Sequence, residues 1–244
     1  MHTFDYGGFI VREDIRAAHG ALWEHIRAAG SWWTGAERVA IAAEARTADS
    51  CRLCIARQSA LSPGAVQGEH QSTGLLPQNV VDVIHRVRTD PARLSRPWFD
   101  GVVGGGLAVP AYVELIGVLT MLTGVDYVAR SLGVAPFPLP EPRAGTPSRY
   151  QPPSAKSGTA WVPMIAPEDA SGPEADLYSP GAMIPNIVRA LSAVPAEVRM
   201  LQVLSAAHYL PVEQIVDLTA RRALDRMQME LVAARVSALN QCFY

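Results

Sequence analysis

The chain has 244 residues, of which 49% are hydrophobic and 18% are charged. This length and composition predict one large folded domain or two small ones and exclude disorder as the dominant state. The formal net charge of −2 provides no positive surface for nucleic acid or an anionic membrane, so we expect neither as a partner. Three cysteines exclude a disulfide scaffold, and their odd number leaves at least one thiol without a partner in the chain.

The amino terminus has an acidic residue at position 5 and no basic segment before an apolar one. This pattern does not support a secretory signal, so we expect a cytoplasmic location. The longest apolar stretch runs from Leu107 to Val125 and contains Pro110 and Glu114. We interpret it as a buried core helix rather than a membrane span.

Helical periodicity dominates the chain, and no convincing strand pattern appears, so we predict an all-α fold. The first block is EDIRAAHGALWEHIRAAG. Thr34 and Glu37 then form a capping-box pattern that predicts a helix start. Asp49 and Ser50 predict a break, which places Cys51 in the first turn of the next helix. Further helices are expected at about 77–87, 107–132, 184–192, 195–208 and 222–239, and the glycines of 101–106 predict a flexible loop.

Proline marks the middle of the chain, because thirteen of the nineteen prolines fall between Pro136 and Pro195. This segment is therefore extended and rich in turns. It is either a solvated linker or a strap that packs on the helices, and Trp161, Met164 and Ile165 favour the strap. We divide the chain into a first helical unit at 1–133, the proline-rich segment at 134–183 and a second helical unit at 184–244.

Cys51 and Cys54 form a CxxC pair at a predicted helix start. Backbone N–H groups and the helix dipole stabilise a thiolate there, which lowers the pKa of the leading cysteine and makes it a nucleophile. The alternative is half of a zinc site, which needs two more ligands from Cys242 and the scattered histidines. Covalent haem attachment requires a histidine directly after the second cysteine, where Ile55 stands instead.

An internal match appears at an offset of 191 residues, where residues 37–51 align with 228–242 and Cys51 aligns with Cys242. The second copy reads MELVAARVSALNQCFY. With the segments WWTGAERVAIAAEARTADSCRLC, VIHRVRTDPARLSRPW and YVELIGVLTMLTGVDYVARSLG, it resembles the alkyl hydroperoxidase D-like group of the carboxymuconolactone decarboxylase superfamily. The signature of that group is Glu-x11-Cys-x-x-Cys-x3-His. The resemblance implies two helical repeats, of which the second is incomplete.

In that group a dithiol reduces a peroxide, and a glutamate and a histidine relay the proton of the thiol. By resemblance, Glu230 matches the relay carboxylate and Cys242 the first sulfur. The second sulfur and the histidine would follow at positions 245 and 249. Because such sites can carry selenocysteine, whose codon is UGA, we also expect that the reading frame could continue past Tyr244 as a selenoprotein.

The first copy departs from the signature, since Val39 and Gln58 occupy the positions of the relay glutamate and histidine. Glu44 could replace the carboxylate only if the turn differs. His85, on a predicted amphipathic helix, is a candidate base for the CxxC pair, whereas a packed or surface histidine is the alternative. Glu114 is a candidate proton shuttle or else a core carboxylate with a satisfied partner. His208 and Tyr209 are weaker candidates.

The sequence therefore predicts a thiol-dependent peroxidase or related thiol oxidoreductase with Cys51, Cys54, Glu230 and Cys242 as catalytic residues. Its expected partners are a small peroxide, a dithiol protein or low-molecular-weight thiol as reductant, and further copies of the chain. We expect no cofactor and no metal. The alternatives are a non-redox enzyme of the carboxymuconolactone decarboxylase type and a non-catalytic helical oligomerisation module.

Overall fold

The computed structural model describes residues 3–158, 160–181, 183–240 and 242, and this part of the chain is all-α, as predicted. It contains no strand, only an isolated bridge between Lys156 and Met164. The α-helices of the described residues are α1 (Glu13–Arg27), α2 (Gly35–Ala48), α3 (Arg52–Ser59), α4 (Gln78–Thr89), α5 (Arg96–Gly104), α6 (Val109–Ser131), α7 (Asn186–Arg189), α8 (Pro195–His208) and α9 (Arg226–Leu239). Short 3-10 turns are η1 (Pro63–Ala65), η2 (Pro91–Arg93), η3 (Pro167–Asp169), η4 (Gly172–Glu174) and η5 (Val212–Gln214).

The capping box predicted at Thr34 is confirmed. Its hydroxyl accepts from the backbone N–H of Glu37, whose carboxylate in turn accepts from the backbone N–H of Thr34. The break at Asp49 is also confirmed, because α2 ends at Ala48. Cys51 is the N-cap of α3 rather than a residue of its first turn. The chain thus turns sharply just before the CxxC pair.

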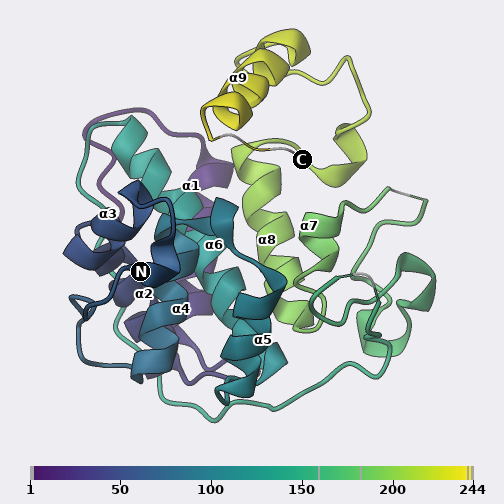
Figure 1. Ribbon diagram of the computed structural model, residues 1–244. Helices are drawn as coiled ribbons and strands as arrows, with labels where there is room; N and C mark the ends of the chain where they lie inside the picture. The colour runs from purple at the N-terminus through teal and green to yellow at the C-terminus, as the bar shows by residue number, and fades with distance from the viewer. Residues whose placement is uncertain (1–2, 159, 182, 241, 243–244) are drawn as a thin grey trace.

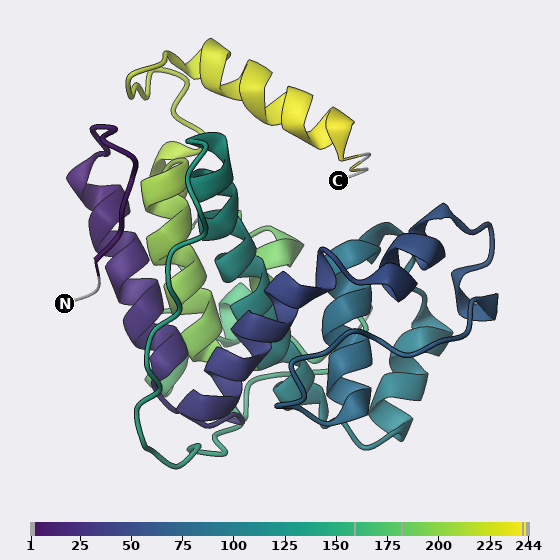
Figure 2. The ribbon, with the colours of Figure 1, turned by 90° about the vertical axis from the view of Figure 1, so that its left-hand side faces the viewer.

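Helix α6 runs through the middle of the bundle, with α1 and α8 on one side and α2 and α4 on another (Figures 1 and 2). By length and composition it is the one described helix that could cross a membrane, yet 61% of its most apolar window is buried in the protein. Its buried side chains include Leu115, Val118 and Met121. α6 is therefore a core helix, as its proline and glutamate predict.

Two local predictions are wrong. The segment 101–106 is not a flexible loop throughout, because α5 continues to Gly104 and its N-cap Ser95 accepts from the backbone N–H of Trp98. Segment 184–192 forms only the single turn of α7. At α5 the glycine-rich composition is outweighed by the cap at Ser95 and by the packing of Phe99 in the main core.

The proline-rich segment packs on the helices as a strap. Phe137, Ile165 and Leu177 are buried in the main core, whereas Trp161 is 39% exposed. The indole N–H of Trp23 donates to the carbonyl of Pro138, and the hydroxyl of Tyr178 donates to the carbonyl of Ile165. These contacts favour the strap over the solvated linker.

Helix α8 packs against α1 and α6 in the same core. The three-unit division of the chain stays a prediction. α9 lies across one end of the bundle (Figure 2). Several of its apolar side chains are exposed, namely Met227, Leu231, Val232, Val236 and Leu239.

Candidate functional site

Four side chains converge where α2, α3 and α4 meet. Cys51 and Cys54 come from the start of α3, His70 from the loop after it and His85 from α4. Nδ1 of His70 lies 3.6 Å from Sγ of Cys51 and 3.5 Å from Sγ of Cys54. Nδ1 of His85 lies 3.2 Å from Sγ of Cys54. One sulfur, that of Cys54, therefore contacts both imidazoles.

The outer nitrogen of each imidazole is bound by a carboxylate. Nε2 of His85 lies 2.8 Å from Oε1 of the fully buried Glu44, and Nε2 of His70 lies 3.0 Å from Oδ1 of Asp82. The other oxygen of Glu44 accepts hydrogen bonds from Thr73 and from the hydroxyl of Ser72. With the outer nitrogens occupied in this way, both Nδ1 atoms face the sulfurs.

The imidazoles change the proton affinity of the sulfurs. Burial raises the pKa of Cys54, but hydrogen bonds with His70 and His85 outweigh burial and lower this pKa to about 6. The pKa of Cys51 is lowered against the same opposing burial, by the backbone N–H of Cys54 and by His70. A shift at Cys51 is what its place at a helix start predicts. The sequence did not indicate the larger shift at Cys54.

The pKa values of the histidines shift in the opposite direction, whereas that of the Glu44 carboxylate is lowered like those of the sulfurs. Burial lowers the pKa of His70, yet Asp82 and both sulfurs overcome it and raise this pKa to about 10. The pKa of His85 is also raised, by Cys54 and Glu44 against burial. Burial raises the pKa of Glu44, but hydrogen bonds from Thr73 and His85 leave it lowered overall.

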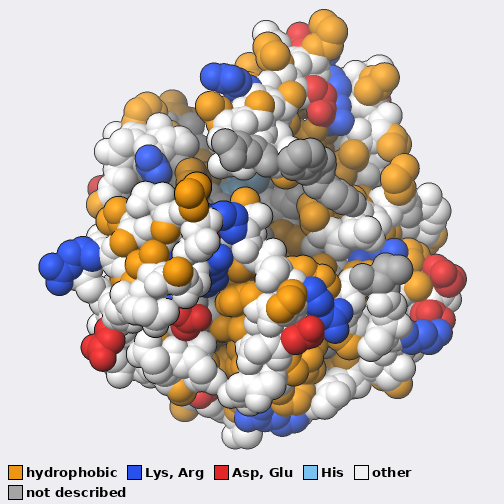
Figure 3. All heavy atoms as spheres, in the orientation of Figure 1, with side chains coloured by type: hydrophobic (Ala, Val, Ile, Leu, Met, Phe, Trp, Pro, Cys, Tyr) orange, Lys and Arg blue, Asp and Glu red, His pale blue; other side chains and the backbone are white. Residues whose placement is uncertain are grey.

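Both sulfurs are enclosed, since Cys51 is 0% and Cys54 is 2% exposed. Neither is in a disulfide bond. Cys54, unlike Cys51, lines a groove of about 1070 Å³. Its lining comes from the ends of α2 and α4, from α3 and α6, and from Val236 of α9 and the following Asn240. The surface is hollowed beneath α9 in Figure 3.

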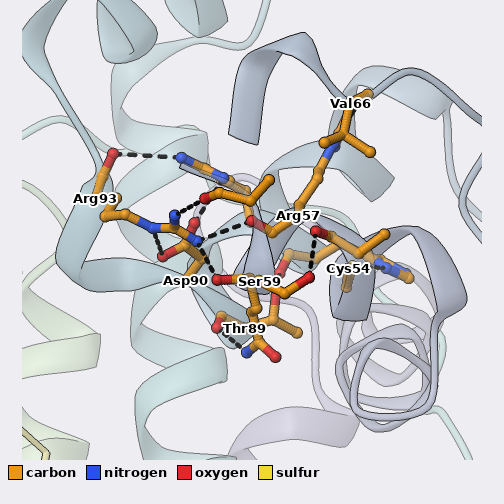
Figure 4. A network of polar contacts seen from close by, with 12 residues as sticks. Cys54, Arg57, Ser59, Val66, Thr89, Asp90 and Arg93 are labelled. Atoms are coloured by element: carbon orange, nitrogen blue, oxygen red, sulfur yellow. Dashed lines mark hydrogen bonds and ion pairs between the residues drawn. The ribbon is translucent and has the colours of Figure 1, made fainter. Parts of the chain in front are cut away.

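A network of polar contacts fixes the far end of α3 (Figure 4). The guanidinium of Arg93 donates to the carbonyls of Arg57, Gln58 and Ala60, the last at 2.7 Å. Its Nε donates to Oδ1 of Asp90, also at 2.7 Å. The carbonyls of Gln58 and Ala60 gain partners in this way at a helix end, and the carbonyl of Arg57 also accepts from the backbone N–H of Ala60. Arg93, the last residue of η2, therefore links the end of α3 to η2.

The structure places Glu230 and Cys242 away from this cluster. Glu230 is on α9, where it pairs with Arg226 and accepts a hydrogen bond from Tyr209. Cys242 is exposed beyond the end of α9. Their assignment to a second catalytic site stays a prediction.

Two other candidates lie in different surroundings. The carboxylate of Glu114 is buried, and burial raises its pKa. It accepts from Arg38 at 3.2 Å and from the backbone N–H of Trp32 at 2.7 Å, which identifies it as a core carboxylate with satisfied partners. His208 lies 2.8 Å from His19, ring nitrogen to ring nitrogen.

His70 and Asp82 were not predicted as site residues from the sequence. His70 follows Gly68 and Glu69 in a loop without periodicity, so its position could not be inferred from a pattern. Asp82 could have been found, because it precedes His85 by three residues and therefore lies on the same face of α4. The donor atoms of Cys51, Cys54, His70 and His85 all lie within 4.8 Å of one another, a set that could hold a metal ion.

Comparisons with models of known families, with curated proteins and with solved structures found no match to this chain. The resemblance to the alkyl hydroperoxidase D-like group therefore depends on its sequence motifs. The site itself is defined by the side-chain geometry.

Proposed function

We propose that the protein is a thiol-dependent peroxidase, or a related thiol oxidoreductase, that uses Cys51 and Cys54. The observation that carries the proposal is the series from Sγ of Cys54 through His85 to Glu44, with contacts of 3.2 and 2.8 Å. A sulfur, an imidazole and a buried carboxylate in this order can take up and return a thiol proton. The resemblance implies the same kind of relay, although it assigned other positions to it.

Cys54 is the attacking sulfur in this proposal, because it contacts both imidazoles and lines the groove. His85 accepts the proton of the Cys54 thiol. The thiolate then attacks the terminal oxygen of a hydroperoxide, so that an S–O bond forms and the O–O bond breaks. The alkoxide that leaves takes the proton from His85 and departs as an alcohol, while Cys54 is oxidised to a sulfenic acid.

Cys51 resolves the sulfenic acid. Its sulfur attacks that of Cys54, the S–S bond forms, and the hydroxide that leaves combines with the proton of Cys51 as water. His70 can carry this proton, because its Nδ1 is within 3.6 Å of both sulfurs. A dithiol protein or a low-molecular-weight thiol returns two electrons and two protons and restores the reduced pair.

The test is to titrate the reduced, metal-free chain with hydrogen peroxide in a Cys242→Ser background, which removes the exposed thiol. We expect one equivalent of peroxide to consume both remaining thiols, with reversal by a dithiol. In the Cys51→Ser variant, a sulfenic acid trapped on Cys54 by a dimedone probe is expected to accumulate. Thiols that do not react with peroxide would overturn the proposal and favour a non-redox enzyme or an oligomerisation module.

A further inference from the structure

We propose that Cys51, Cys54, His70 and His85 form a four-coordinate binding site for Zn²⁺. Two thiolates and two imidazoles are a ligand set that zinc takes in structural sites. The sequence supplies them as Cys-x2-Cys-x15-His-x14-His, in which only the first pair has a familiar short spacing. The fold brings the two histidines to the pair from a loop and from the next helix.

Three of the six distances between the donor atoms are close to the edge of a tetrahedron around zinc, and all six are within 4.8 Å. Zinc bonds of about 2.3 Å to sulfur and about 2.05 Å to nitrogen give a sulfur-to-nitrogen edge of about 3.6 Å. The three observed sulfur-to-nitrogen distances are 3.2, 3.5 and 3.6 Å. A metal ion at the centre of the cluster needs only small shifts of the side chains.

The carboxylates orient the ligands as at known zinc centres. Histidine ligands donate the N–H of their second nitrogen to a carboxylate or carbonyl, which fixes the tautomer and raises the basicity of the coordinating nitrogen. Glu44 is this carboxylate partner for His85, and Asp82 is this partner for His70. Arg57, 3.1 Å from Asp82, offsets part of the negative charge of the two thiolates and two carboxylates.

The surrounding packing indicates what the ion would stabilise. Cys51, Leu53 and Cys54 form a small apolar cluster with Val66 that is separate from the main core. The loop from Ala60 to Pro77 has the turn η1 as its only helical element. So small a core contributes little stability, and a metal that joins α3, this loop and α4 would order the segment.

This inference does not rest on the proposed peroxidase activity. It does set a condition on that activity, because sulfurs bound to zinc are not available to form a disulfide. The zinc form would keep the pair reduced, and the metal-free form would react with peroxide.

Cobalt(II) provides the test, because its visible spectrum reports coordination geometry and ligands. The reduced full-length chain, without a histidine tag and treated with a chelator, is titrated with CoCl₂ and then with ZnCl₂. We expect one equivalent of cobalt to give the intense bands of a tetrahedral ion and a thiolate charge-transfer band, and zinc to displace it. A six-coordinate spectrum without thiolate bands would overturn the proposal.

Single substitutions test which side chains bind the metal ion. Cys54→Ser is expected to abolish the thiolate tetrahedral spectrum, whereas Cys242→Ser keeps it. Asp82→Asn provides a milder change, since this side chain is 44% exposed, and it is expected to weaken zinc binding about 10- to 100-fold with the helical circular dichroism intact. Asp100→Asn, at a similarly exposed carboxylate on α5, is the matched control. Equal zinc affinity in Asp82→Asn, Cys54→Ser and the unaltered chain would rule the site out.

Discussion

The proposed proton relay depends on one side chain, that of His85. It bridges Cys54 and Glu44 within the core, so its loss removes the relay without changing the dithiol. We predict that His85→Asn slows oxidation of the metal-free thiols by peroxide about 100-fold, the lower end of the usual contribution of a proton-transfer group. The rate is measured by stopped-flow with a thiol probe. His208→Asn, a change at a half-buried histidine far along the chain, is the control, and equal slowing in both variants would contradict the role of His85.

The His19 and His208 pair predicts a loss of stability in acid. Burial, followed by the charge of His208, lowers the pKa of His19 to about 4 from an ordinary value of 6.5. Below pH 6.5 the unfolded chain therefore binds a proton that the folded chain does not, and stability falls until the pH reaches about 4. The expected loss from His19 is roughly 2 kcal/mol between pH 7.5 and pH 5.

The measurement is urea unfolding at these two pH values, for the unaltered chain and for His19→Gln. Taking the difference between the chains cancels titrations elsewhere, including those of His70 and His85, whose raised pKa values act in the opposite direction. If the variant loses as much stability on acidification as the unaltered chain, His19 does not titrate in the predicted way.

At the scale of single residues, only part of the candidate site was predictable from the sequence. The CxxC spacing identified the two sulfurs, and Glu44 and His85 were both named as candidates on helices. The sequence did not reveal that Glu44 binds His85, because that contact joins two helices through a tertiary arrangement. His70 is in an irregular loop, whose path depends on packing rather than on any repeat in the sequence.

At the scale of secondary-structure elements, the carboxyl-terminal end of α3 provides a test of what holds this helix in place. Arg93 binds three carbonyls at this end (Figure 4). Arg93→Ala is expected to cost about 1.5–3 kcal/mol, the range for hydrogen bonds that involve a charged group, and to increase amide hydrogen exchange in α3 specifically. Arg96→Ala, which removes an exposed pair with Asp100, is the control. Unchanged exchange in α3 would show that the helix end does not need Arg93.

The helices themselves were largely predictable, because α1 and α4 have strong apolar periodicity, α2 and α9 begin with capping boxes, and α6 is a long apolar stretch. α5 was missed because its glycines predict a loop, whereas the buried Phe99 and the cap at Ser95 outweigh them. The strap was anticipated from its apolar residues, but its path over the helices was not.

For the whole molecule, a buried ionic network joins segments distant in sequence. Arg38 of α2 contacts Glu114 of α6 at 3.2 Å and Glu197 of α8 at 3.0 Å. His25 of α1 also contacts Glu197, at 2.9 Å. These partners are 159 and 172 residues from Glu197 along the chain, so the network ties the second predicted unit to the first.

Removal of Glu197 should therefore destabilise the whole bundle. Glu197→Ala leaves part of the charge of Arg38 buried without a partner, and losses of about 3–5 kcal/mol are typical of such changes. Thermal unfolding followed by circular dichroism is expected to show a lower midpoint and a single transition. Glu168→Ala, at an exposed position in η3, is the control. A second transition that leaves α1–α6 folded would instead indicate that the two predicted units are independent.

The position of α9 bears on the proposed activity. Val236 of α9 and Asn240 just after it line the same groove as Cys54, and at the start of α9 Arg226 donates to the carbonyl of Ile215. If Cys54 reduces peroxides as proposed, the end of α9 borders the space in which a peroxide meets this sulfur, and the volumes of the side chains at 236 and 240 would then decide how bulky a hydroperoxide the protein accepts.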